Sequence, residues 1–326
     1  MPLVRAEELT YDRIRVLDPQ RSIAFLAVSA LEVHGPHLPI VQDVAMASWM
    51  AEETARRFAA RHEDWLVAVF PPLTLGADEL PLRGSMDAPP GAVYRVLLGH
   101  GASLARAGFG TVVVTNGHGG PRHAAALERA CRRTSRRRGI RMITPSIQVL
   151  HRIITGGRNA RLEELLGRTL DERERRALVT GEHAGAWETS FMLAERPHLV
   201  DPCYRRLGPA APPPFRPLQA LGERFAPLRG AAEGLAGSIG WLLNAHFGYG
   251  GAEVSYKGDP SVATPEIGHG FREILAEDCL EIVEGVTTGA IAPETVRSIA
   301  SDHAIIQPGF FARLAIAAAA LAALLS

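Results

Sequence analysis

The sequence predicts an α/β fold in which mostly parallel strands form a central sheet with helices on both faces. Short apolar runs at residues 23–28, 65–70 and 111–115 have the length and composition of buried parallel strands. Each run is followed by a stretch of helical periodicity, at 44–60, 91–107 and 122–138. Polar, glycine-containing clusters follow the first and third runs, at the strand ends where open α/β sheets bind ligands.

Composition narrows the class of protein. The 326 residues suffice for one large α/β domain or two modest ones. The 35 basic and 35 acidic side chains cancel, so no net field attracts nucleic acid, and a small, uncharged substrate suits the chain better. Three widely spaced cysteines without a Cys-x-x-Cys pair, and a charged N-terminus without a signal-peptide segment, predict reduced thiols and a cytoplasmic location.

The first polar cluster contains ligand types of zinc, manganese and iron sites. Glu32 and His34 leave the first strand two residues apart, which in extended backbone places both side chains on one face. Asp43 follows nine residues after His34 and can join the same shell. The alternative is a polar loop that follows a strand and binds nothing.

The second strand is expected to break at Pro71 and Pro72, and residues 76–90 are too rich in Gly, Pro and Asp to be anything but a loop. Loops of this length are often functional. The helix at 91–107 is expected to end at Gly108, a residue suited to a left-handed cap.

The second polar cluster is Asn116-Gly117-His118-Gly119-Gly120, at the end of the most β-branched strand. Its glycines allow close approach of a ligand. A phosphate-binding loop is the alternative, but its motif is missing. The basic helix at 122–138 is expected to be solvated on its charged face, and a strand is expected at 141–144.

The third cluster follows a charged helical stretch, 151–180, which we interpret as an insertion. It contains Glu182, His183 and Glu188, and it opens a helix at 188–194. Glu188 falls in the first turn, where the helix dipole favours a carboxylate without any metal, so capping competes with ligation.

The remaining chain predicts a lid and an extension. Residues 208–237 are rich in proline and predict a loop or lid, and residues 264–284 predict a long amphipathic helix. We expect one domain at 1–284 and a C-terminal helical extension at 285–326. The apolar run 314–325 is too short to span a bilayer, so a buried helix is favoured over a weak tail anchor.

The clusters, in this order, resemble the creatininase family of metal-dependent amidohydrolases. The family includes creatinine amidohydrolase, a deformylase of flavin and deazaflavin biosynthesis, and a mycofactocin-processing peptidase. The similar segments are 32–39 with Asp43, 116–120, 183–190 and the late segment 256–264 with Gly268.

The resemblance implies a Rossmann-like three-layer sandwich, usually in a homo-oligomer and often in a hexamer. It also implies two divalent ions, Zn²⁺ or Mn²⁺, with Fe²⁺ as a third option. Glu32 and His118 would hold one ion and His34 the other, with Asp43 bridging them and Glu188 as the fifth ligand.

Two departures from the family pattern concern the substrate. Creatinine-hydrolysing members have a Glu where this chain has Gly120, which weakens the case for creatinine itself. The loop at 76–85 has Glu79 followed by Leu80 where a Glu-His pair is expected, so the substrate contacts of this loop are expected to differ from those of the family.

The function predicted from these residues is hydrolysis of a C–N amide bond by a hydroxide that bridges the two metals. His183 is the predicted donor of a proton to the leaving nitrogen, and Glu182 would orient its ring or shuttle the proton. His37 and Asn116 are expected to contact the substrate or to support the ligands. The alternatives are a peptidase that trims a short modified peptide and a catalytically silent, metal-stabilised subunit.

Overall fold

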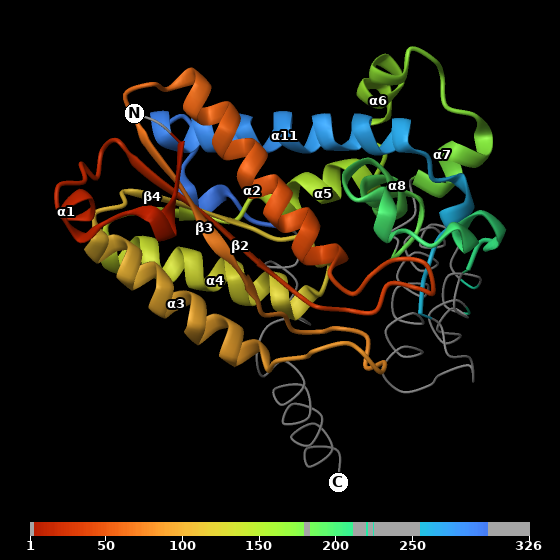
Figure 1. Cartoon of the computed structure of the whole chain (residues 1–326), viewed down its shortest axis with the longest axis horizontal. Coiled ribbons are helices and arrows are strands. Elements are labelled where there is room, and N and C mark those ends of the chain that lie inside the picture. Colours follow the sequence, from red (N-terminus) through yellow and green to blue (C-terminus); the bar gives the residue numbers. More distant parts are fainter. Residues whose placement is uncertain (1–2, 179–182, 211–219, 221–223, 225–254, 299–326) are drawn as a thin grey trace, which may run out of the picture.

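The computed structural model describes residues 3–178, 183–210, 220, 224 and 255–298. Its centre is a five-stranded sheet of order β1-β3-β2-β4-β5, in which every neighbouring pair is parallel. The strands are β1 (Leu3–Arg5), β2 (Ser22–Ser29), β3 (Leu66–Thr74), β4 (Thr111–Thr115) and β5 (Arg141–Ile143). Helices cover both faces (Figure 1), so the predicted three-layer α/β class is confirmed.

Four long helices form the two outer layers. They are α2 (Gln42–Arg61), α3 (Pro90–Ala107), α4 (Pro121–Arg138) and α11 (Pro265–Thr288). Helices α3 and α4 lie against one face of the sheet, and α2 and α11 lie against the other (Figure 1). The shorter elements are η1 (Ala6–Glu8), α1 (Tyr11–Ile14), α5 (Ser146–Ile154), α6 (Asn159–Leu166), α7 (Glu172–Leu178), α8 (Ala186–Glu195), η2 (Pro197–Leu199), η3 (Pro202–Arg206), η5 (Pro260–Val262) and η6 (Pro293–Thr295).

The core is divided by the alternation of side chains along the strands. On β2, Ile23 and Phe25 pack with α2 and α11, whereas Ala24 and Leu26 pack with α3 and α4. All eight residues of β2 are buried. Burial on both faces explains why the sequence of this strand is a continuous apolar run rather than an alternating one.

The order of strands places the first two polar clusters together. From β2 the chain passes to β3 on one side, and then to β4 on the other side of β2. The direction of the connections therefore reverses between β2 and β4, and ligands of such sheets bind in the crevice beyond the carboxyl ends of the two strands. The segments after β2 and after β4 both begin there.

The structure corrects the predicted end of the second strand. β3 continues through Pro71 and Pro72 to Thr74. Leu26 pairs with Phe70 and Val28 pairs with Leu73, so β3 has an extra residue at this irregularity. Prolines are tolerated at a bulge because no ladder bond needs their missing N–H groups. Strand β1 has no counterpart among the elements expected from the sequence.

The helices that were predicted within the described residues are present, and the residues at which they begin and end differ slightly from the predicted ones. The stretch 151–180 contains the end of α5, α6 and α7, and Leu162 of α6 is buried against Gly270 of α11. Arg161 adds a two-bond ion pair to Glu277 of α11. It remains a prediction that residues 151–180 are an insertion. The domain boundary at residue 284 also remains a prediction.

Helix α4 is buried on one face and basic on the other, as expected. Cys131 and Cys279 are buried, Cys203 is half-buried, and all three thiols are free.

Among the described residues, no helix is both long and apolar enough to cross a membrane. Most of the predicted lid and the whole apolar run 314–325 lie outside the described residues.

Candidate metal centre

The first ligand segment leaves β2 and turns sharply into α2. Gly35 adopts φ +65°, and a Cβ at this position would lie 2.9 Å from Nδ1 of His37. The N–H of Gly35 donates to the carbonyl of Ser255 at 2.7 Å, which ties the turn to the late segment. Asp43 lies in the first turn of α2, so the helix directs its carboxylate back toward Glu32 and His34.

The second ligand segment is held by Asn116. Its Oδ1 accepts from the N–H of His118 at 2.9 Å, and its Nδ2 donates to the His118 carbonyl at 2.7 Å. The hydroxyl of Ser29, at the end of β2, donates to the same Oδ1 at 3.0 Å. Asn116 is fully buried, so it shapes the loop and joins it to the neighbouring strand.

The third segment pairs with the late segment. The backbone of His183 exchanges hydrogen bonds of 3.0 and 2.7 Å with Lys257, in an antiparallel bridge. Gly185 caps the N-terminus of α8, and Glu188 lies in its first turn. These contacts bring Glu188 to the end of the sheet where the first two segments meet.

The three segments converge so that the carboxylate of Asp43 faces two separate groups. Oδ1 of Asp43 lies 3.1 Å from Nε2 of His34, and Oδ2 lies 3.1 Å from Nδ1 of His118. Nδ1 of His118 is also 2.9 Å from Oε2 of Glu32, and Nε2 of His34 is 3.5 Å from Oε2 of Glu188. Of three groups of facing donor atoms among the described residues, two share this carboxylate, one in Glu32, Asp43 and His118 and the other in His34, Asp43 and Glu188. The third is Glu32, His34 and His183.

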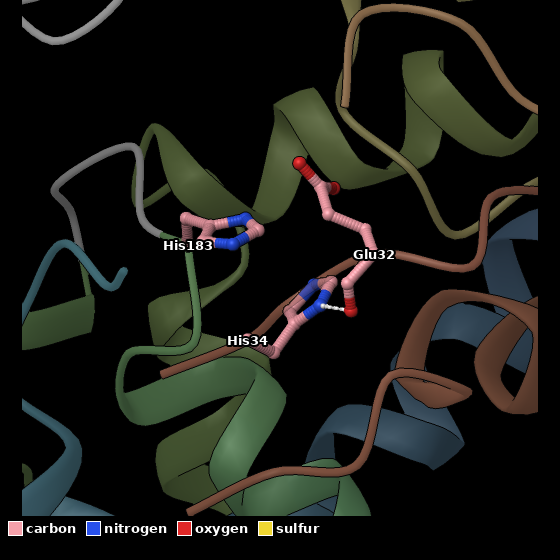
Figure 2. Close-up of side chains that lie close together, drawn as sticks. All are labelled: Glu32, His34 and His183. Atoms are coloured by element: carbon pink, nitrogen blue, oxygen red, sulfur yellow. Dashed lines mark hydrogen bonds between the residues drawn. The ribbon is translucent and has the colours of Figure 1, made fainter. Parts of the chain in front are cut away.

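Backbone carbonyls fix the tautomers of both histidines. Nδ1 of His34 donates to the carbonyl of Glu32 at 3.0 Å (Figure 2). Nε2 of His118 donates to the carbonyl of Ala77 at 3.0 Å. A carbonyl only accepts, so the other nitrogen of each ring faces the carboxylates and is the one that can bind a metal once its proton is lost.

The donor set fits divalent cations. Oε2 of Glu32, Nε2 of His34 and both carboxylate oxygens of Asp43 are buried and make no well-aligned hydrogen bond among the described residues, because the groups that they face belong to the same cluster. Leaving such atoms without a partner is costly, and a bound cation would satisfy all four. Carboxylate and imidazole ligands suit zinc, manganese and iron.

The two imidazoles of this cluster and the carboxylates of Asp43 and Glu32 shift one another's pKa toward the charged forms. Burial opposes the imidazolium of His34, but Asp43 and Glu188 outweigh it and raise its pKa to about 10. Glu32 and Asp43 raise the pKa of His118 against burial in the same way. Conversely, despite burial, His34 and His118 lower the pKa of Asp43, and His183 and His118 lower that of Glu32. A cation that binds here replaces the protons on the two imidazoles.

His183 lies against this cluster. Its Nε2 donates to the carbonyl of Val33 at 2.7 Å, and its ring centroid is 4.1 Å from that of His34. Figure 2 shows both rings and the Glu32 carboxylate turned toward a common space, and donor atoms of the three lie within 4.8 Å of one another. Burial and the charge of His34 lower the pKa of His183 to about 4, below the ordinary value of 6.5 for histidine.

Three other residues were predicted at the site: Glu188, His37 and Glu182. Oε2 of Glu188 accepts from the N–H of Ala184 at 2.5 Å, so the geometry accommodates both capping and ligation. Burial raises the pKa of Glu188 to about 7. His37 is buried and its Nε2 lies 2.8 Å from the hydroxyl of Thr189, which places it beside the ligands. Glu182 lies outside the described residues.

Several groups at the site have no signature in the sequence. Besides the Ala77 carbonyl, the N–H of Leu80 donates to Oε1 of Glu32 at 2.5 Å. Glu79 is buried beside them, and burial together with Asp87 raises its pKa to about 8. His123 of α4 is fully buried, with its ring centroid 5.4 Å from that of His118. The length of the loop pointed to all three residues of it, Ala77, Glu79 and Leu80, and the departure from the family pattern pointed to Glu79 and Leu80.

Known proteins resemble the chain in sequence and in fold. The Creatininase family model, described as creatinine amidohydrolase, matches residues 7–283. A mycofactocin precursor peptide peptidase of Mycobacterium ulcerans (strain Agy99) is 26% identical over 270 residues, which cover 81% of this chain and 85% of that protein.

Solved structures share the fold. A mutant creatininase of Zn-Zn type matches with a TM-score of 0.58 and 19% identity, over 87% of this chain and 98% of its own. A manganese creatininase matches with a TM-score of 0.56 and 21% identity, over 87% and 98%. A mutant creatininase complexed with creatine matches with a TM-score of 0.57 and 21% identity, over 88% and 99%.

Proposed function

The chain belongs to the creatininase family, and on that premise we propose that it is a metal-dependent hydrolase that cleaves the C–N bond of a small amide. One observation carries the proposal: three segments far apart in sequence bring two sets of ligand atoms together around one shared carboxylate. The proposed ligands are Glu32, His34, Asp43, His118 and Glu188. The two ions are proposed to be Zn²⁺, Mn²⁺ or one of each, and Fe²⁺ is a third option.

Two divalent cations, when bound, supply an activated water and polarise the carbonyl of the amide. The chain's own residues position and protonate the reacting groups. Because Nε2 of His183 donates to the Val33 carbonyl, its Nδ1 carries the lone pair. Burial keeps this imidazole neutral at neutral pH, so it can first accept a proton and then return it to the leaving nitrogen.

His37 is proposed to position the substrate or the ligands. It is buried, its Nε2 contacts the hydroxyl of Thr189, and its ring lies edge-on to Tyr256 with the centroids 6.3 Å apart. Asn116 is proposed to act only through the loop that presents His118. Glu182 keeps its predicted role beside His183 as a proposal drawn from the sequence.

The substrate class is a small cyclic amide, a formamide or a short peptide. The similarity to a mycofactocin precursor peptide peptidase supports the peptidase as the second candidate. Gly120 speaks against creatinine, because a Cβ there would already lie 2.6 Å from the Ala77 carbonyl oxygen and leave no room for a glutamate. A homo-oligomer and a cytoplasmic location also remain predictions.

Purified protein tests the proposal directly. We expect about two divalent ions per chain and hydrolysis of at least one member of a panel with a cyclic amide, an N-formyl compound and a short peptide. A chelator should abolish this hydrolysis, and zinc or manganese should restore it. Loaded protein that cleaves none of the panel would favour the silent-subunit alternative, and hydrolysis that survives chelation would exclude the metal-dependent mechanism.

A further inference from the structure

A single turn, residues 77–80, contacts two proposed ligands through its backbone. The carbonyl of Ala77 accepts from Nε2 of His118 at 3.0 Å, and the N–H of Leu80 donates to Oε1 of Glu32 at 2.5 Å. Both ligands belong to the same set of donor atoms. His34 and Glu188, in the other set, bond instead to the Glu32 carbonyl and the Ala184 N–H, so the two sets have different supports.

Asp78 fixes this turn. Its side chain is 3% exposed, and its Oδ2 accepts from the backbone N–H of Arg122, in the first turn of α4, at 2.6 Å. Its Oδ1 accepts from the guanidinium of Arg122, and its own N–H donates to Oδ1 of Asp87 at 3.0 Å. Asp78 has φ +73°, a conformation that Asp and Asn adopt more readily than other side chains.

Gly120 leaves the space that this arrangement requires. A Cβ on residue 120 would lie 2.6 Å from the Ala77 oxygen and would also overlap Nε2 of His118. The hydrogen bond between Ala77 and His118 therefore depends on a residue without a side chain at position 120. Any larger residue must displace the turn, the imidazole, or both.

We infer that Asp78 is a positioning residue for one of the two ion sites, the one formed with Glu32 and His118. By anchoring the turn to α4, it holds the Ala77 carbonyl and the Leu80 N–H where they orient the two ligands. The inference rests on the proposed function, since it assumes that these atoms bind a cation. Loss of a group that orients metal ligands typically weakens metal affinity about 10- to 100-fold.

The test uses variants that leave one ion site at a time. In Glu188→Gln the remaining ion belongs to the Glu32–His118 site, and in Glu32→Gln it belongs to the His34–Glu188 site. Zinc affinity is measured for each full-length protein by competition with a chelator, and thermal melting monitors the fold. Adding Asp78→Ala should weaken zinc binding about 10- to 100-fold in the Glu188→Gln protein and leave it unchanged in the Glu32→Gln protein.

Two controls separate positioning from general stability. Arg122→Ala removes the guanidinium but keeps the backbone N–H that Asp78 accepts, so its zinc affinity should match the parent protein. Asp78→Asn keeps an acceptor oxygen and tolerates the positive φ, so it should restore most of the affinity lost in the alanine variant. If Asp78→Ala does not fold, Gly120→Ala tests the turn instead: its Cβ must displace the turn, the His118 imidazole or both, and it should weaken zinc binding in the Glu188→Gln background and not in the Glu32→Gln background.

Equal loss of affinity in both backgrounds would overturn the inference, because a purely structural role has no preference between the sites. Unchanged affinity in the Glu188→Gln background would overturn it as well. If wild-type protein binds two ions and either result is found, the proposed function survives. If wild-type protein binds none, both proposals are refuted.

Discussion

The shared carboxylate of Asp43 makes the sharpest prediction. Its Oδ1 and Oδ2 lie 3.1 Å from Nε2 of His34 and Nδ1 of His118, respectively, so each proposed ion site includes one oxygen of this residue. We expect Asp43→Asn to lose both ions, although asparagine has nearly the same shape. Glu188→Gln, which alters one set of donor atoms, should lose only one ion.

The expected loss of metal affinity follows from the negative charge that Asp43→Asn removes. Two unit charges 4 Å apart interact by about 4 kcal/mol at an effective dielectric constant of 20. A carboxylate that ligates an ion lies closer than this, and the ion is divalent, so about 4 kcal/mol is a cautious figure even after desolvation is deducted. That energy corresponds to about a thousandfold higher Kd at each site.

The assay is the metal content of wild-type and variant proteins after dialysis against a weak chelator. Asp64→Asn is the matched control, because Asp64 is an exposed aspartate that pairs with Arg21 away from the site. We expect about two ions in wild type and in the control, one in Glu188→Gln and none in Asp43→Asn. An Asp43→Asn protein that keeps either ion would remove Asp43 from the bridge.

Three further predictions concern catalysis, pH and packing. His183→Ala should keep both ions but lose hydrolysis at least about a hundredfold, the scale of a lost general acid or base; metal loss measured in this variant would make His183 a ligand instead. In cation-free protein, His34 has a folded pKa of about 10 against about 6.5 unfolded, so its stabilising effect is complete below pH 6.5 and is lost as pH rises toward 10. The melting temperature in chelator should therefore fall across pH 6.5–10 and fall less with zinc present; a flat profile in chelator would contradict the assigned charges. Gly268→Ala should destabilise by about 1–3 kcal/mol in denaturant unfolding, because the new Cβ meets the Ser190 carbonyl and Ala194 of α8. Gly99→Ala, on an exposed part of α3 where a Cβ meets nothing within 4 Å, should stabilise by about 0.5–1 kcal/mol, and equal effects of the two changes would refute the packing argument.

Local pattern was sufficient for most of the fold. Burial of β2 on both faces requires an unbroken apolar run, and that run is visible in the sequence. The local pattern gave a wrong prediction where the pairing between neighbouring strands decides the structure. Pro71 and Pro72 predicted a break, yet they lie at an irregularity in the ladder with β2, where their missing N–H groups cost nothing. Strand β1 is three residues long and pairs only with β3, so no local periodicity reveals it.

For the proposed metal centre, the sequence by itself determined the types of donor group, because carboxylates and imidazoles clustered among glycines are a donor set wherever they lie. Only the tertiary structure decided how the donors are shared. The reversal of strand order between β2 and β4 places the two oxygens of Asp43 between two histidines, and the packing of α8 against α11 brings Glu188 to His34. The supports at Ala77 and Leu80 are backbone groups, which every residue carries, so no residue type could have marked them in advance.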